Sequence, residues 1–170
     1  MRLSHFYECI NFQITNPQTD FMFMTKVRKE SSFYLDNAEN YDSSAVKEFL
    51  VRHGENYKIV FLSSKRVGYL RLNIFEHEGR SVQSVGLDLA KEYRGKGLSV
   101  IIYKKIIKEL QKSTLPIVLW VLDFNYRGLH IYKKLGFREV NRSVFVQKST
   151  NRRCEKIMMA FDKTASLPSL

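Results

Sequence analysis

The chain has 170 residues, a length that fits one domain with a sizeable core. Its hydrophobic fraction of 44% and aromatic fraction of 13% are typical of a globular protein and exclude wholesale disorder. The formal net charge of +11 favours anionic partners, such as nucleic acid or a phosphorylated ligand. Residues 1–15 lack a continuous apolar stretch, and no later segment approaches the roughly 20 apolar residues that span a bilayer. We therefore expect a soluble, cytoplasmic protein without a membrane partner.

Metal and nucleic-acid sites have little support in the sequence. Cys9 and Cys154 lie far apart, and the four histidines lack a metal-ligand spacing. We therefore expect no metal. The basic residues are scattered rather than gathered in a tract, and no nucleic-acid-binding motif is present. Nucleic-acid binding remains the weaker explanation of the charge.

The first half of the chain predicts one helix and an antiparallel meander. Residues 43–53 are typical of a helix with a serine cap, and residues 57–63 of a strand. Two further strands are expected around residues 67–75 and 81–90, joined by short polar turns, so this part of the sheet should be antiparallel. Alternation in the second strand places five residues on one face: Val67, Tyr69, Arg71, Asn73 and Phe75.

The second half predicts two helices and three strands. Apolar residues recur at helical spacing from Leu98 to Leu110, while Lys104 and three further lysines fall on the expected wetter side. Residues 117–122 are apolar and β-branched, which indicates a buried strand. A short helix follows, with Asn125 as its N-cap and Gly136 just after its end, and two closing strands lie around residues 137–147 and 154–161. This order predicts a mixed α/β domain.

A glycine-rich stretch, YRGKGLS at residues 93–99, lies between the third expected strand and the next helix. Free backbone N–H groups and the helix dipole converge at a helix N-terminus, so this arrangement favours phosphate binding. Gly95 and Gly97 permit positive φ or close backbone approach, while Arg94 and Lys96 add positive charge. An ordinary connecting turn remains the alternative.

Two nucleotide-binding motifs fit this stretch poorly. The pattern G-x-x-x-x-G-K-[ST] is absent. The dinucleotide pattern G-x-G-x-x-G fits at Gly95 and Gly97, but Val100 replaces the third glycine and the preceding strands are expected to be antiparallel. The sequence therefore argues against a Rossmann-type domain.

Two segments in order resemble one known family. RGKGLS, residues 94–99, resembles the acyl-CoA pyrophosphate loop R/Q-x-x-G-x-G/A of the GNAT N-acetyltransferases, with Ser99 at its last position. NYRGLHIYKKLGF, residues 125–137, is similar to the second signature of that family, N-x-x-A-x-x-x-Y-x-x-L-G-F, with Gly128 for the alanine. The closing CEKIMMAF resembles its last strand. The resemblance covers roughly residues 57–162.

The resemblance implies a single GNAT-like domain with a mainly antiparallel, splayed central sheet flanked by helices. Residues 1–56 would form its N-terminal part on the acceptor side, residues 57–162 the acetyl-CoA-binding core, and residues 163–170 a flexible tail. Acetyl-CoA, the co-substrate, would lie between the splayed strands. The residues implied to bind it are Leu87, Asp88, Leu89, Arg94, Gly95, Lys96, Gly97, Leu98, Ser99, Asn125 and Tyr132.

The resemblance also implies that Tyr132 is the general acid. A phenol with a pKa of about 10 can return a proton to a thiolate whose conjugate acid has a pKa of about 8.5. Simple packing on Leu129 and Leu135 is the structural alternative for this ring. A backbone N–H near residues 87–89 would stabilise the oxyanion.

The general base is less clearly indicated. Many relatives carry a glutamate at one of two positions, which align here near Gln83 and Trp120. Asp88 is our candidate for the base, with Glu76 and Asp123 as alternatives that could act through water. An acceptor that arrives as a neutral amine would need no base.

We therefore expect an N-acetyltransferase that moves an acetyl group from acetyl-CoA to a primary amine by direct attack in a ternary complex. The acceptor is expected to be a protein N-terminus, an amino sugar or another small amine, and the basic charge favours an anionic or phosphate-bearing one. The sequence leaves the acceptor and the oligomeric state open. Two alternatives are a non-catalytic CoA-sensing module with the same fold and a basic nucleic-acid-binding domain.

Overall fold

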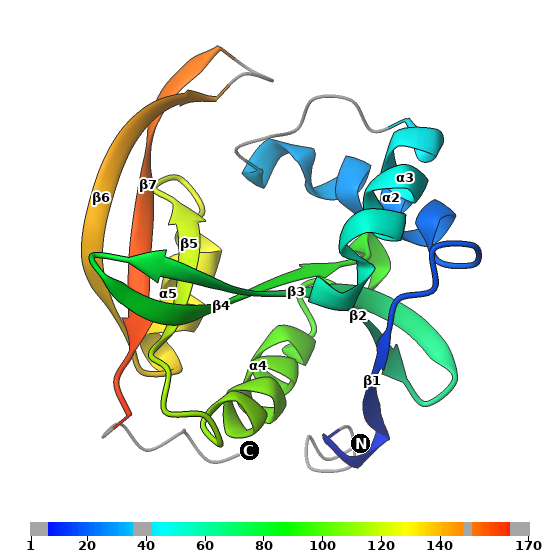
Figure 1. Cartoon of the computed structure of the whole chain (residues 1–170), viewed down its shortest axis with the longest axis horizontal. Helices are drawn as coiled ribbons and strands as arrows, with labels where there is room; N and C mark the ends of the chain where they lie inside the picture. The colour runs from blue at the N-terminus through cyan, green and yellow to red at the C-terminus, as the bar shows by residue number, and fades with distance from the viewer. Residues whose placement is uncertain (1–6, 36–41, 148–150, 164–170) are drawn as a thin grey trace.

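The computed structural model describes residues 7–35, 42–147 and 151–163, in which seven strands form one sheet in the order β1-β2-β3-β4-β5-β7-β6 (Figure 1). Neighbouring strands are antiparallel except β4 and β5, which are parallel, so the expected mixed α/β class and mainly antiparallel sheet are confirmed. In chain order the elements are β1 (Ile10–Ile14), α2 (Phe21–Ser31), η1 (Ser32–Tyr34), α3 (Ser43–His53), η2 (Gly54–Asn56), β2 (Tyr57–Leu62), β3 (Lys65–His77), β4 (Arg80–Leu89), η3 (Lys91–Tyr93), α4 (Leu98–Leu110), β5 (Ile117–Leu122), α5 (Tyr126–Lys134), β6 (Phe137–Gln147) and β7 (Arg152–Phe161).

Helices cover both faces of the first half of the sheet, with α2 and α3 on one side and α4 on the other (Figure 1). Successive side chains of a strand point to opposite faces. Ile59 of β2 accordingly belongs to the buried cluster that contains Met24 and Leu50 of α2 and α3. Val60, the next residue, belongs to the larger cluster that contains Ile102 of α4. No helix in the described ranges has both the length and the apolar composition that a bilayer crossing requires.

Two local expectations were wrong. The helix over residues 43–53 is present, but its N-cap is Asp42, whose carboxylate accepts a hydrogen bond from the backbone N–H of Ser44. Lys104 of α4 is buried instead of lying on the wetter side of its helix. Burial lowers the pKa of this lysine, and the nearby charge of Lys134 adds to the effect.

The residues that were expected to share one face of β3 do not all lie on the same face. The pairing of β2 with β3 shifts register between Val60 and Phe61. As a result, Val67 packs in the α4 cluster, whereas Tyr69 packs in the cluster of α2 and α3. At Gly68 the backbones approach so closely that a Cβ would lie 2.3 Å from the carbonyl oxygen of Asp88.

The sheet splays between β4 and β5. These two strands pair at only two positions, Gln83 with Ile117 and Ser84 with Val118. Residues 85–89 of β4 continue to pair with β3 on their other side, but they do not pair with β5. The splayed sheet implied by the family resemblance is therefore present.

A second connection joins the two halves of the sheet at the far end of the splay. The side-chain amide of Gln147, at the end of β6, donates hydrogen bonds to the carbonyl oxygens of Phe33 at 3.1 Å and Leu35 at 2.7 Å. Gln147 is fully buried. The β6–β7 hairpin is thereby attached to the segment that follows α2 (Figure 1).

We expect Gly68→Ala to lower the free energy of unfolding by about 1–3 kcal/mol or more, because the added methyl group would displace the backbone of β4. Urea denaturation measures the change, which should appear in the transition midpoint. Lys65→Ala, at an exposed position of the same strand, is the control. Equal stability of the two variants would contradict the close approach.

Candidate active site

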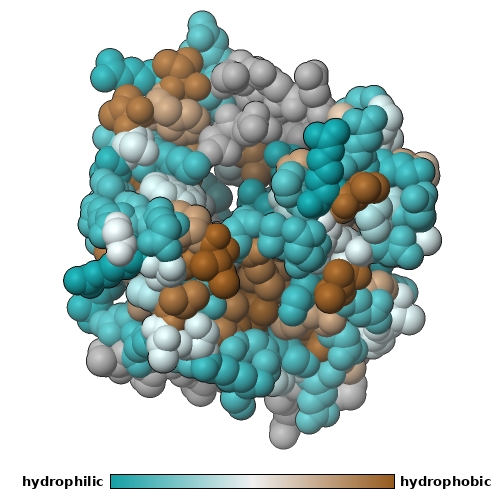
Figure 2. All heavy atoms as spheres, viewed as in Figure 1, coloured by the Kyte–Doolittle hydropathy of each residue, from teal (hydrophilic) through white to brown (hydrophobic). Residues whose placement is uncertain are grey.

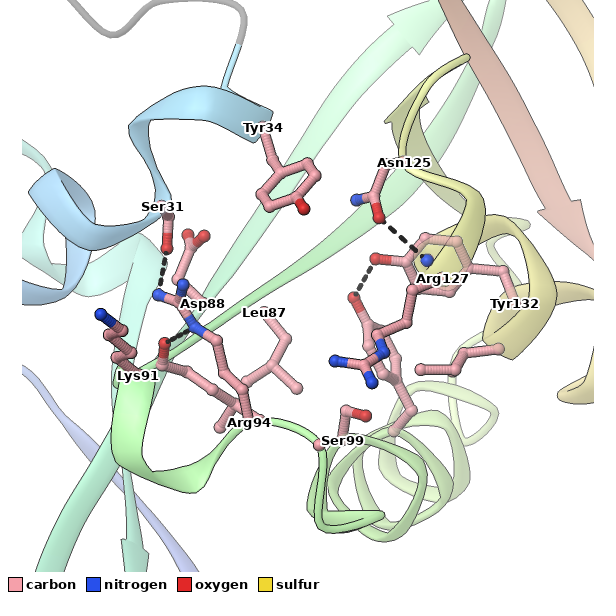
Figure 3. Close-up of a pocket in the computed structure, with 15 residues that line it drawn as sticks. Ser31, Tyr34, Leu87, Asp88, Lys91, Arg94, Ser99, Asn125, Arg127 and Tyr132 are labelled. Carbon is pink, nitrogen blue, oxygen red and sulfur yellow. Dashed lines mark hydrogen bonds between the residues drawn. The ribbon is translucent and has the colours of Figure 1, made fainter.

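A cavity of about 410 Å³ opens where β4 and β5 separate. Its walls come from the end of β4, the start of α4, helix α5 and η1 (Figure 3). In Figure 3, Ser31, Asp88 and Arg94 lie on one side of the cavity, and Asn125 and Tyr132 lie on the other. Elements that are far apart in the sequence thus surround one cavity at the point where β4 and β5 separate.

The glycine-rich turn leads into α4 at the base of this cavity. Gly95 and Gly97 both have positive φ, 78° and 76°, which explains why glycine occupies these two positions. Gly97 is the N-cap of α4, and no side chain caps the helix there. Since the first N–H groups of a helix lack partners within it, the amides of this turn are available to an anion.

The side chain of Arg94 anchors the turn. Its guanidinium donates hydrogen bonds to the carbonyl oxygens of Leu89 and Glu30 and to the hydroxyl of Ser31, at 2.8 to 2.9 Å. The Glu30 carboxylate in turn accepts a hydrogen bond from the backbone N–H of Lys91. The end of α2 is therefore tied to the start of the turn, and Arg94 contributes position as well as charge.

Arg127 of α5 lies close to the turn from the opposite side. A Cβ at Gly95 would lie 3.8 Å from its nearest guanidinium nitrogen. Asn125, two residues earlier, caps α5 as expected, because its side-chain oxygen accepts a hydrogen bond from the N–H of Gly128 (Figure 3). By fixing the start of α5, the Asn125 cap thus positions the Arg127 guanidinium beside the free backbone N–H groups of the glycine-rich turn.

Tyr132 of α5 both packs in the core and reaches the cavity. Its ring makes edge contacts with Tyr103 and Phe137, at centroid distances of 5.3 and 6.1 Å. The hydroxyl of Tyr103 donates a hydrogen bond to that of Tyr132 at 3.3 Å (Figure 3). Burial raises the pKa of the Tyr132 phenol, and the bond from Tyr103 offsets this only in part. Tyr132 therefore remains protonated at neutral pH and can donate its own proton.

Asp88 is the only one of the three candidate carboxylates that lines the cavity among the described residues. It is buried, and an oxygen of its carboxylate lies 3.3 Å from Nη2 of Arg71. Burial, the largest single effect, lowers the pKa of the Arg71 guanidinium, but the Asp88 carboxylate and the nearby phenols of Tyr69, Tyr57 and Tyr103 together raise the pKa above its ordinary value. Glu76 is exposed and accepts a hydrogen bond from the hydroxyl of Ser81.

Gln83, the residue near which the family resemblance places a glutamate, has a structural role here. Its side-chain amide donates hydrogen bonds to the carbonyl oxygens of Leu110 at 2.9 Å and Leu115 at 3.1 Å. These bonds hold the connection between α4 and β5 beside the last pair of the splayed strands. A carboxylate could not donate either bond.

Most of the residues expected to bind a cofactor line this cavity. Those that do are Leu87, Asp88, Leu89, Arg94, Gly95, Ser99, Asn125 and Tyr132. The other three residues are not part of its lining: Lys96 and Gly97 are exposed, and Leu98 packs in the core. Sequence reasoning missed Ser31, Tyr34, Lys91, Tyr103, Arg127, Gly128 and Ile131. Among these residues, the position of Arg127 follows from the sequence, because the Asn125 cap marks the start of α5 and Arg127 lies two residues later.

Comparison with known sequences identifies the family. A sequence model of the acetyltransferase (GNAT) family matches residues 21–137, more than half of the chain. The chain therefore belongs to the acetyltransferase (GNAT) family, as its two motifs indicated. A curated relative, the thialysine N-epsilon-acetyltransferase of Bos taurus, is 33% identical over 67 residues. This match spans 39% of the chain and only 39% of the relative.

Solved structures share the fold at low sequence identity. The ribosomal-protein-alanine N-acetyltransferase from Brucella melitensis has a TM-score of 0.74 at 15% identity, over 88% of this chain and 98% of that one. Microcin C7 self immunity acetyltransferase MccE, in complex with acetyl-CoA and AMP, has a TM-score of 0.72 at 12% identity, over 89% and 91%. A chain of the NatC complex bound to Gag peptide and CoA has a TM-score of 0.66 at 18% identity, over 91% and 99%.

We expect Arg94→Ala to lower the free energy of unfolding by about 1–3 kcal/mol, because three hydrogen bonds from a charged group would be lost. Thermal or urea unfolding measures the change. Lys96→Ala removes the other cation of the turn at an exposed position and should change stability by no more than about 0.5 kcal/mol. An equally small effect of Arg94→Ala would show that these bonds do not hold the turn.

Proposed function

We propose that the protein is an N-acetyltransferase that transfers the acetyl group of acetyl-CoA to a primary amine by direct attack in a ternary complex. The observation that carries this proposal is the single cavity that joins the unpaired edge of β4, the glycine turn at α4 and the hydroxyl of Tyr132. The acceptor is a small amine or a protein N-terminus. Cys9 and Cys154 are not joined in a disulfide, which fits a reducing compartment, and a cytoplasmic location is part of the proposal.

The cofactor would lie along the gap between β4 and β5. Leu87, Asp88 and Leu89 have no β5 partner, so the backbone groups on the outer edge of this segment can pair with the amides of the pantetheine arm. The N–H groups from Arg94 to Ser99 would hold the pyrophosphate, where the dipole of α4 also favours negative charge. The acetyl-CoA in the MccE structure and the CoA in the NatC complex structure support acetyl-CoA as the cofactor of this fold.

The chemistry requires one proton to leave the amine and one to reach the sulfur. The amine nitrogen attacks the thioester carbonyl carbon, an N–C bond forms and the C–S bond breaks. Tyr132 would donate its hydroxyl proton to the departing thiolate, and Tyr103, which donates to Tyr132, would orient that proton. A backbone N–H in the segment from Leu87 to Leu89 would stabilise the oxyanion.

Asp88 is the proposed base. Its carboxylate lines the cavity and can accept the ammonium proton directly or through one water molecule. The ion pair with Arg71 holds this carboxylate in place beside the cavity. An α-amine, with a pKa of about 8, loses its proton more easily than a lysine side chain, with a pKa of about 10.4.

We expect acetyl-CoA to raise the melting temperature by on the order of 5–10 °C at a hundred times its dissociation constant. Binding to the folded state alone contributes about 2.7 kcal/mol under that condition. Thermal unfolding with acetyl-CoA, and with NAD and ATP as controls, measures the shift. No response at millimolar acetyl-CoA would refute the proposed cofactor site.

We expect Tyr132→Phe to reduce kcat by about 100-fold or more while the dissociation constant of acetyl-CoA changes little, because the ring remains and only the transferred proton is lost. Steady-state kinetics and calorimetry separate the two quantities. Tyr126→Phe, at an exposed position of the same helix, is the matched control. Wild-type kcat in Tyr132→Phe would remove the acid role.

A further inference from the structure

A second cavity of about 200 Å³ lies on the face of the sheet that carries the β3, β4, β5 and β7 residues Arg71, Gly86, Trp120 and Lys156. Tyr34 lines both this cavity and the larger one, so the two spaces adjoin at its ring. The surface between the β6–β7 hairpin and the α2–α3 side is hollowed in Figure 2. A volume of this size admits a group no larger than a small metabolite or the end of a chain.

Arg71 forms the charged floor of this cavity. It pairs with Gly86 across the β3–β4 ladder, and its guanidinium lies flat over that glycine. A Cβ at Gly86 would lie only 3.0 to 3.2 Å from three guanidinium atoms. The glycine therefore leaves the space that this arginine occupies. Only Nη2 of the guanidinium contacts Asp88 in an ion pair, while Nε has no hydrogen-bond partner among the described residues.

The cavity is cationic. Its charged lining residues in the described ranges are Arg71 and Lys156, and Lys156 lies over the Trp120 ring with Nζ 5.0 Å from the centroid. Burial raises the pKa of the Tyr57 phenol in the same lining, and the positive charges of Arg71 and Arg28 partly offset this rise. An anionic group placed here would meet positive charge from two elements, β3 and β7.

We propose that this cavity binds the acceptor and selects an amine that carries a carboxylate or phosphate group, with Arg71 as the residue that determines this specificity. The proposal rests on the proposed function, because it places the acceptor of that reaction. An anion on Arg71 and Lys156 leaves the rest of a small molecule directed past Tyr34 toward Asp88. The amine is then a few bonds from the anionic group, as in an amino acid or an amino-sugar phosphate.

Two matched pairs of amines test the selection: an L-amino acid against its carboxamide, and glucosamine 6-phosphate against glucosamine. We expect kcat/KM for the anionic member of at least one pair to exceed that of its neutral partner by about 10- to 100-fold, since bonds to charged groups change affinities by that factor. The pair that responds distinguishes a carboxylate from a phosphate. Calorimetry on the acetyl-CoA-loaded protein measures binding of the same four compounds without turnover.

Three variants test whether the preference for anionic over neutral amines depends on this cavity. Arg71→Gln and Gly86→Ala should each reduce the ratio between anionic and neutral amines to about one-tenth or less, the second by displacing the guanidinium while the charge is retained. Arg80→Gln removes the same charge from an exposed site at the other end of the β3–β4 hairpin and should leave the ratio unchanged. A ratio within each variant is independent of any general loss of activity.

Several results would overturn the proposal. These are equal use of both members of each pair, an unchanged ratio in Arg71→Gln, and acetylation of an uncharged peptide N-terminus that does not depend on Arg71. If acetyl-CoA binds and no amine is acetylated, the proposed function fails. In that case, anion binding that Arg71→Gln abolishes would still support the pocket, and no binding of any of the four compounds would refute it.

Discussion

The arrangement of the whole protein depends on how briefly β4 and β5 pair. Gln83 with Ile117 and Ser84 with Val118 are the two positions at which strand pairing joins the halves of the sheet in the described ranges. An uninterrupted ladder would satisfy the backbone groups of residues 85–89 with β5 and would leave no space between the strands. Gln83 stabilises the point of divergence, because its buried side chain also fixes the connection that leads into β5. Incomplete pairing is therefore what creates the site.

The separation of β4 and β5 places polar side chains, whose burial costs free energy, beside the cavity. The Arg71–Asp88 pair lies largely out of water, where desolvation offsets much of the attraction between two charges. The phenols of Tyr103 and Tyr132 are likewise held next to each other in a buried setting, and burial raises both pKa values. The positions of these polar groups fit the charges and protons of the reaction proposed for the cavity.

Structural features that depend on a few neighbouring residues could be predicted from the sequence. The positive φ of Gly95 and Gly97 and the Asn125 cap follow from local backbone requirements, which the residue types reveal. Contacts between segments far apart in the sequence could not be predicted from it. Tyr103 occupies an apolar position of its helix, so periodicity identifies it only as core, and its partner lies 29 residues away. The flat packing of Arg71 on Gly86 likewise depends on strand register.

The hydrogen bonds of Gln147 give the space between the two halves a closed outline. The paired residues of β4 and β5 bound it at one end, and the attachment of the β6–β7 hairpin to Phe33 and Leu35 bounds it at the other. The separation of the two halves is therefore fixed at both ends by residues far apart in the sequence. Gln147 lines neither cavity. A substitution there would release one end of the gap and leave in place the side chains that line it, so the width of the gap can be changed independently of its chemistry.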